Sequence, residues 1–230
     1  MDRVRAMSHP AKFTTSILEH AVEMLNERLD LASMTDPPTV LDPFAGTGKG
    51  VEYLRDHGYD AIGVDLEPAG SWGESSHSGG HVYHGDALAL QWAASTFDVI
   101  FTSPTYGNRF ADRDMRKSCA GTYMKGLQRE ASEGSSCHMQ WGPKYREFHL
   151  LAWNEARRVL KPGGYFLLNI SDHYRNKMPQ PVSAFHVEVL CELGFEWIDA
   201  KAVPAPRMKN GANAQYRCAV EWLHLFKFVA

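Results

Sequence analysis

The stretch Val40–Gly48 constrains the fold of this chain more than any other. It reads Val-Leu-Asp-Pro-Phe-Ala-Gly-Thr-Gly, an apolar start followed by a glycine-rich turn. Its first two residues are typical of a buried strand. Glycine carries no Cβ, so Gly46 and Gly48 allow a sharp turn and the close approach of a ligand. The spacing of Val51 and Leu54 predicts that a helix follows. Such a unit places a ligand at the carboxyl end of its strand.

The glycine pattern departs from two common nucleotide sites. A P-loop needs a glycine five residues before its Gly-Lys pair and a Ser or Thr after it. Pro43 and Gly50 occupy those places, which disfavours a nucleoside triphosphate. A dinucleotide site has the pattern G-x-G-x-x-G. Here Val51 stands where the third glycine belongs.

Composition and charge narrow the class of protein. The chain has 230 residues and is 44% hydrophobic, which suits one soluble α/β domain with a substantial core. The sequence shows neither an apolar run of membrane-spanning length nor a signal-peptide pattern. The four cysteines form no C-x-x-C pair, so neither a disulfide framework nor a common zinc site is indicated, and the cytoplasm is the default expectation. The net charge of −3 requires any nucleic-acid contact to use a local basic patch.

The remaining chain alternates predicted strands and helices, which is typical of a doubly wound, mostly parallel α/β sheet. We expect one domain over residues 1–230. Besides the strand that begins at Val40, its predicted strands are 60–65, 82–87, 97–102 and 165–170, with an antiparallel pair at 195–203 and 217–228. Its predicted helices are 15–29, 49–57, 145–160 and 182–193.

Two features follow predicted strands at the same edge of the sheet. Asp65 lies about twenty residues after the glycine turn, where an acid binds ribose hydroxyls in nucleoside-binding α/β folds. Ser103-Pro104-Thr105-Tyr106 follows the apolar strand 97–102. Ser103 Oγ and the Pro104 carbonyl can each accept hydrogen bonds. Tyr106 offers a flat aromatic face.

These motifs, in this order, resemble those of the S-adenosylmethionine-dependent amino methyltransferases of DNA. That family places D-P-F-x-G-x-G at its glycine turn and S/D/N-P-P-Y after its fourth strand. The segment His9-Pro-Ala-Lys-Phe13 resembles the one that covers the methionine end of the cofactor in that family. The departure is Thr105, which stands where the family has its second proline and does not fix φ as proline does.

The resemblance implies a seven-stranded methyltransferase fold with an antiparallel final strand. It implies S-adenosylmethionine as cofactor, bound by Lys12, Phe13, Asp42, Phe44, Gly46, Gly48, Asp65 and Asp86. It also implies that Ser103, Pro104 and Tyr106 act on an exocyclic amine of a flipped DNA base. The serine form of the tetrad favours cytosine N4 over adenine N6.

Residues 107–146 are predicted to be an insertion that contacts the substrate. They contain eight Lys and Arg against four Asp and Glu, a balance of +4, with Tyr123, Trp141 and Tyr145 interleaved. Basic and aromatic side chains beside a base pocket favour a nucleic-acid surface. The residues expected to bind DNA are Arg109, Arg113, Arg116 and Lys117. No metal is expected, because the spacing of Cys119, Cys137 and His138 matches no common zinc template.

Two alternatives remain open from the sequence. Tyr106-Gly107 also fits the P-P-Y-G tetrad of some tRNA guanine methyltransferases, although the separate RNA-binding domain usual in those enzymes is not evident. Because Thr105 departs from the family tetrad, a non-catalytic DNA-binding relative that kept the fold is also compatible with the sequence. Both a monomer and a homodimer are compatible with the sequence.

Overall fold

A computed structural model describes residues 14–67, 80–107, 132–205, 216 and 218–229. It contains a seven-stranded sheet with the order β3-β2-β1-β4-β5-β9-β8. Neighbouring strands are parallel except β9, which is antiparallel to both β5 and β8. The strands are β1 (Thr39–Asp42), β2 (Asp60–Asp65), β3 (Val82–His84), β4 (Phe97–Thr102), β5 (Leu160–Ile170), β8 (Phe195–Pro204) and β9 (Val220–Phe228). The predicted fold class is confirmed.

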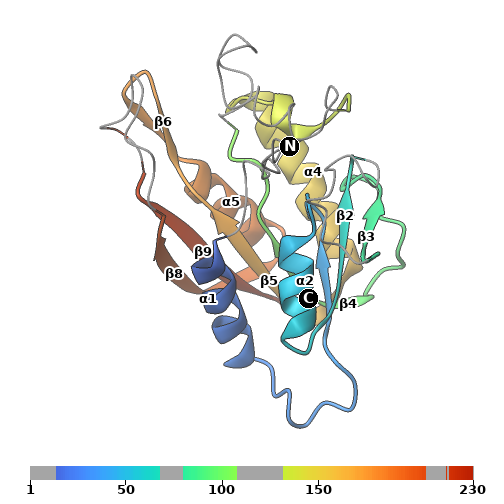
Figure 1. Cartoon of the computed structure of the whole chain (residues 1–230). Helices are drawn as coiled ribbons and strands as arrows, with labels where there is room; N and C mark the ends of the chain where they lie inside the picture. Colours follow the sequence, from blue (N-terminus) through green and yellow to red (C-terminus); the bar gives the residue numbers. More distant parts are fainter. Residues whose placement is uncertain (1–13, 68–79, 108–131, 206–215, 217, 230) are drawn as a thin grey trace, which may run out of the picture.

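Helices cover both faces of this sheet (Figure 1). On one face, α1 (Thr15–Asn26) and α2 (Lys49–Asp56) pack over a core that includes Val99, Phe101 and Leu167. On the other face, α4 (Pro143–Val159) and α5 (Val182–Glu192) pack over a second core that includes Trp153 and Phe166. Because both faces are buried there, β4 is continuously apolar over Val99–Phe101 and β5 over Tyr165–Leu168.

Several predicted boundaries were wrong for local reasons. The first helix ends at Asn26 rather than Leu29. Strand β5 begins at Leu160, which pairs with Phe97 before Gly163 turns the chain at φ +80°. A second sheet, the hairpin of β6 (His173–Arg175) and β7 (Met178–Gln180), was not predicted. Its turn uses Asn176 and Lys177 at positive φ without the glycine that usually signals such a turn.

The strand order gathers several chain segments at one edge. Strands β1 and β4 are neighbours, β2 and β3 follow β1 to one side, and β5 follows β4 to the other. The order of strands therefore reverses between β1 and β4. In open α/β sheets, ligands bind outside the carboxyl ends of the strands at this reversal. We refer to that side of the sheet as the carboxyl edge. None of the described helices is long and apolar enough to span a membrane.

Candidate active site

The glycine turn is held tightly against β2. Gly46 and Gly48 adopt φ of +54° and +79°, and Gly48 is the N-cap of α2. The Ala45 amide donates to the Val64 carbonyl at 2.9 Å. A Cβ on Gly63 would collide with that of Ala45, so the turn and β2 approach too closely for a side chain between them. This packing leaves the amino end of α2 directed at the carboxyl edge.

Asp65 ends β2 and supports this turn. Its Oδ2 accepts a hydrogen bond from the Gly46 amide at 2.9 Å, and its Oδ1 accepts one from the Glu67 amide at 2.8 Å. The carboxylate is thus fixed beside the glycine turn. Carboxylate oxygens accept hydrogen bonds, which is the role that a ribose hydroxyl requires. The ribose contact itself stays a prediction.

Asp42 links the glycine turn to the strand that precedes the tetrad. Its Oδ1 accepts hydrogen bonds from Thr102 Oγ1 at 2.6 Å and from the Phe44 amide at 3.0 Å. Its Oδ2 is buried and has no hydrogen-bond partner among the described residues. Burial raises the pKa of Asp42 to about 7, and the nearby Asp65 charge acts in the same direction. A buried carboxylate oxygen without a donor favours a ligand that carries positive charge.

The raised pKa of Asp42 predicts how the free protein responds to pH. The stabilisation that the neutral carboxyl group contributes is fully present below pH 3.8, the pKa of Asp42 in the unfolded chain. It is lost as the pH rises through about 7, the pKa of Asp42 in the folded protein. Asp42→Asn stays neutral, so its melting temperature should exceed that of the wild type by several degrees at pH 8. The difference should shrink toward pH 4, because ~1 kcal/mol shifts the Tm of a domain this size by about 2–4 °C.

Thermal melts of the free protein across this pH range measure that difference. Asp60→Asn is the control, because Asp60 is exposed at the start of β2. A constant Tm difference between Asp42→Asn and wild type from pH 4 to pH 8 would contradict the raised pKa.

Phe44 turns its ring away from the glycine turn toward α4. The ring centroid lies 6.1 Å from that of Phe148, 5.9 Å from that of His149 and 5.8 Å from that of Trp153. Contacts of this kind anchor the turn to the helix layer. The predicted contact between Phe44 and the cofactor stays a prediction.

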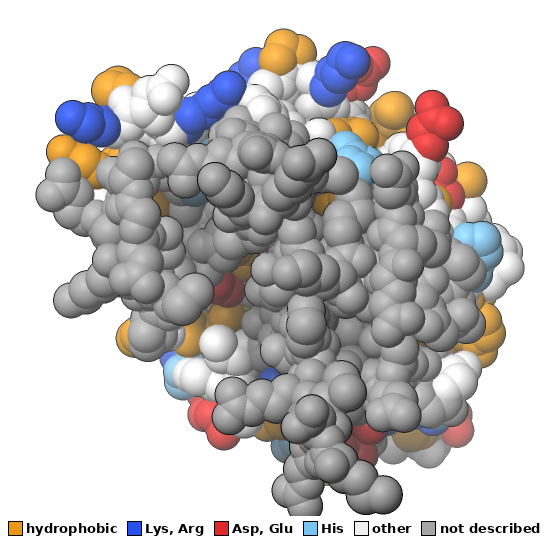
Figure 2. Space-filling view, turned by 45° about the horizontal axis from the view of Figure 1, so that its top comes forward, with side chains coloured by type: hydrophobic (Ala, Val, Ile, Leu, Met, Phe, Trp, Pro, Cys, Tyr) orange, Lys and Arg blue, Asp and Glu red, His pale blue; other side chains and the backbone are white. Residues whose placement is uncertain are grey.

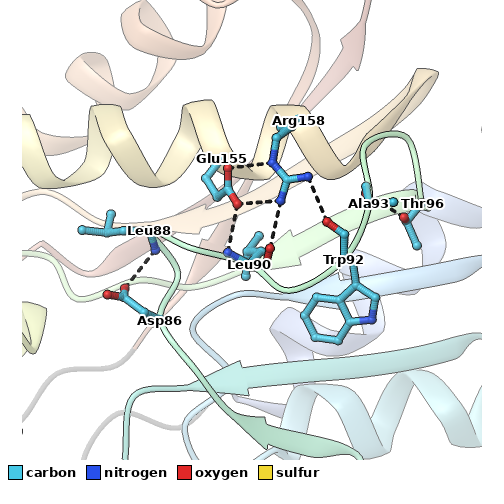
Figure 3. A network of polar contacts seen from close by, with 8 residues as sticks. All are labelled: Asp86, Leu88, Leu90, Trp92, Ala93, Thr96, Glu155 and Arg158. Atoms are coloured by element: carbon cyan, nitrogen blue, oxygen red, sulfur yellow. Dashed lines mark hydrogen bonds and ion pairs between the residues drawn. The ribbon is translucent and has the colours of Figure 1, made fainter.

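Asp86 lies just beyond β3 in a loop that α4 holds in place. Its Oδ1 accepts a hydrogen bond from the Leu88 amide at 2.9 Å. Glu155 accepts from the Leu90 amide at 2.9 Å, and Arg158 donates to the Leu90 and Trp92 carbonyls at 2.9 Å each (Figure 3). The Arg158 guanidinium also holds the pKa of Glu155 below its usual range. Asp86 is exposed, which leaves it accessible for the predicted adenine contact.

Hydrogen bonds to neighbouring residues hold Thr105 in place, whereas a proline at this position would be rigid without them. Its Oγ1 donates toward the carbonyl and the hydroxyl of Ser136, at 3.2 and 3.0 Å. Its carbonyl accepts a hydrogen bond from the Tyr145 hydroxyl at 2.7 Å. Ser136 belongs to a short helix, η2 (Ser136–His138). The tetrad is therefore fixed from outside by residues of the predicted insertion and of α4.

A buried chain of side chains continues from Tyr145 into the protein. Trp153 Nε1 donates to His186 Nδ1 at 2.9 Å, and His186 Nε2 lies 2.9 Å from the Tyr145 hydroxyl. Burial lowers the pKa of His186 well below its usual value. The neutral ring therefore carries its proton on Nε2 and donates it to Tyr145. This leaves the Tyr145 hydrogen for the Thr105 carbonyl.

Ser103 and Tyr106 contact two buried polar residues that the sequence analysis missed. Asn169 is the second-last residue of β5 and Glu221 is the second residue of β9, and they are 1% and 8% exposed. Asn169 Nδ2 lies 3.1 Å from Ser103 Oγ, 3.2 Å from Tyr106 Oη and 3.0 Å from Glu221 Oε2. Tyr106 Oη donates to Glu221 Oε2 at 3.1 Å and lies 3.3 Å from Ser103 Oγ. We call these four residues the tetrad cluster.

The alternation of side chains along each strand explains the tetrad cluster. Successive strand residues point to opposite faces, so every second residue shares a face. Ser103 continues the column of Val99 and Phe101, and Glu221 continues that of Leu223 and Leu225. Asn169 is the register partner of Leu223. Each apolar column on the face covered by α1 and α2 thus ends in a polar residue at the carboxyl edge, a signal that the sequence carried.

Several predicted site residues lie outside the described residues. They are Lys12 and Phe13, predicted to bind the cofactor, and Arg109, Arg113, Arg116 and Lys117, predicted to bind DNA. Within the described ranges, no group of three His, Cys, Asp or Glu residues is placed to hold a metal ion.

Comparison with known proteins gives one family and a group of similar folds. A family model described as DNA methylase matches residues 97–226, which include the tetrad and both missed residues. No curated protein matches the chain at a significant level.

Solved structures are similar at the level of the fold. The [4+2]-cyclase SpnF shares 14% identity at a TM-score of 0.56, over 99% of this chain and 88% of its own. The PH0226 protein from Pyrococcus horikoshii OT3 shares 16% identity at a TM-score of 0.50, over 96% and 94%. TrmN from Thermus thermophilus shares 15% sequence identity at a TM-score of 0.51, and the match covers 93% of this chain and 48% of TrmN.

Proposed function

The chain belongs to the DNA methylase family of N6 and N4 methyltransferases, and on this premise we propose that it methylates an exocyclic amino group of a flipped base in DNA. Its cofactor is S-adenosylmethionine. We favour cytosine N4 over adenine N6 as the target, because the tetrad begins with serine. The observation that carries the proposal is the convergence of the glycine turn, Asp65 and the tetrad at the carboxyl edge where the strand order reverses.

The residues at this edge fit the cofactor. When bound, S-adenosylmethionine supplies an electrophilic methyl group, because its sulfur carries a positive charge. Asp42 Oδ2 is a buried acceptor without a donor among the described residues, which suits a cationic ligand. Gly46 and Gly48 leave space for close approach, and Asp65 presents a fixed carboxylate for ribose hydroxyls. Asp42, Gly46, Gly48 and Asp65 therefore hold the cofactor in this proposal.

The tetrad positions the amine. The lone pair of an aromatic amine is delocalised into the base, which makes the nitrogen a poor nucleophile. Ser103 Oγ and the Pro104 carbonyl accept the amine hydrogens and favour tetrahedral geometry at nitrogen, which frees the lone pair. Tyr106 is half-buried beside them and stacks on the base. Positioning of this kind supplies much of a rate acceleration when the methyl group is already activated.

Charge supports nucleic acid as the substrate. Residues 107–146 carry a balance of +4 while the whole chain carries −3. In Figure 2, separate Lys and Arg side chains lie along the upper rim of the view, and Asp and Glu side chains lie on the same rim at its right. Basic side chains that neutralise phosphates release counterions, which makes binding dependent on salt.

A salt titration tests the predicted DNA contacts. The logarithm of the binding constant should fall linearly with the logarithm of salt concentration, and Arg113→Ala or Arg116→Ala should flatten the slope by about one unit each. Arg55→Ala is the control, because Arg55 pairs with Asp60 at the opposite edge of the sheet. Fluorescence anisotropy with a mixed-sequence duplex measures the slopes. Identical slopes for wild type and both variants would remove the two arginines from the interface.

Transfer of a tritiated methyl group from the cofactor to DNA and to RNA tests the function itself. Digestion to nucleosides then identifies the modified base. We expect label in DNA, on N4-methylcytosine. Label on N6-methyladenine would keep the family and change the base, while label in RNA alone would favour the RNA methyltransferase alternative. Cofactor binding without transfer to either nucleic acid would favour a non-catalytic relative.

A further inference from the structure

The hydrogens of the tetrad cluster can be assigned from the chemistry of its members. An ionised carboxylate only accepts hydrogen bonds, so the Tyr106 hydroxyl donates its hydrogen to Glu221. Tyr106 Oη can then only accept from Ser103, which makes Ser103 the donor in that pair. The amide group of Asn169 has two hydrogens for its three neighbours, so one of these hydrogens is shared.

This assignment gives the chain of hydrogen bonds a direction. It runs from Asn169 to Ser103, from Ser103 to Tyr106 and from Tyr106 to Glu221. Ser103 Oγ receives one hydrogen from Asn169 and gives its own away. One of its two lone pairs is left, and it can accept a hydrogen from the target amine. Reversal of the chain would occupy that position with the hydroxyl hydrogen of Ser103.

We propose that Glu221 is a positioning residue that sets this direction and is the end point for the proton released by methyl transfer. The inference rests on the proposed function. Transfer leaves the amine nitrogen with a fourth bond and a positive charge, so the nitrogen must lose a proton. That proton passes to Ser103 Oγ, the Ser103 hydroxyl proton passes to Tyr106 Oη, and the Tyr106 proton passes to Glu221 Oε2. Ser103 and Tyr106 end as they began, and Glu221 ends neutral.

The carboxylate explains how a serine-type tetrad disposes of a proton. A tetrad that begins with aspartate carries its own carboxylate, whereas Ser103 has none. Glu221 supplies that charge from β9, 115 residues from Tyr106 in sequence, and it is buried at the carboxyl edge beside the Tyr106 hydroxyl. Proton transfer to a positioned side chain contributes typically 10²–10⁴-fold to a rate.

Glu221→Gln distinguishes the uptake of a proton at residue 221 from the acceptance of a hydrogen bond there. Glutamine has nearly the same shape and retains an oxygen that accepts from Tyr106, but its amide does not take up a proton. We expect kcat for methyl transfer to fall about 10²-fold, while cofactor affinity and Tm stay near the wild-type values. Glu221→Asp keeps a carboxylate and should recover part of the lost rate. Glu196→Gln is the control, because Glu196 is exposed on β8.

A double-variant cycle tests whether Glu221 acts through Tyr106. Tyr106→Phe interrupts the same chain and keeps the flat face of the ring. If both changes break one path, the double variant should be no slower than the slower single variant. Wild-type kcat in Glu221→Gln would overturn the proposal. Fully additive losses of kcat in the double variant would also overturn it. So would a loss of kcat in Glu221→Gln that is accompanied by a proportionate loss of Tm and of cofactor affinity.

Failure of the proposed function gives a different result. A wild-type protein that transfers no methyl group to any nucleic acid contradicts that function, whatever Glu221 does. The hydrogen-bond chain from Asn169 to Glu221 is then tested separately by carboxyl ¹³C NMR of the free protein. Tyr106→Phe should move the Glu221 signal, and an unmoved signal would overturn the direction of the chain.

Discussion

Tyr106→Ala should reduce kcat/KM for methyl transfer about 10³-fold while cofactor affinity stays nearly constant. The variant loses the face on which the base stacks, which is worth roughly 1–3 kcal/mol. It also loses the hydroxyl that joins Ser103 to Glu221. Tyr106 lies on the tetrad side of the site, whereas Asp65 is bonded to the glycine turn. The loss should therefore fall on transfer and not on cofactor binding.

Three measurements on one preparation distinguish this role from simple packing. Tyr106 also packs against the core on the α4 side, so the alanine variant should lose some thermal stability. Tyr53→Ala is the matched control, because Tyr53 is a half-buried tyrosine on α2 that stacks on His57. It should lower Tm and leave transfer unchanged. Methyl transfer at the wild-type rate by Tyr106→Ala would remove the stacking role and most of the support for an exocyclic amine as substrate.

Asp65→Ala should weaken the binding of S-adenosylmethionine by roughly 1–3 kcal/mol, the loss of charge-assisted hydrogen bonds. That range corresponds to about a 5- to 150-fold rise in Kd. The structure places the effect toward the upper end, because the carboxylate also holds the amides of Gly46 and Glu67. Asp65→Asn keeps one acceptor oxygen and should lose less affinity than Asp65→Ala.

Calorimetric titration of the cofactor measures these affinities. Asp60→Ala is the control, because it removes an exposed acid from the start of the same strand. Unchanged cofactor affinity in a folded Asp65→Ala protein would remove Asp65 from the site.

Local patterns in the sequence were sufficient for the order of elements and for part of the site. The glycine turn follows from residues adjacent in the chain, since only glycine adopts the φ values at Gly46 and Gly48 readily. The strand with Asp65 at its end and the strand before Ser103 were predicted with the observed boundaries. The hairpin after β5 was missed because Asn176 and Lys177 make a turn that usually needs glycine.

The sequence by itself determined the sheet, the glycine turn and the tetrad, because each depends on periodicity or on neighbours a few positions apart. Only the tertiary structure showed that Thr105 is tied to Ser136 and Tyr145, 31 and 40 residues away. It alone joined Asn169 and Glu221 to Ser103 and Tyr106. The physical reason is the strand order, which puts β9 beside β5 and so brings the ends of β4, β5 and β9 together at one edge.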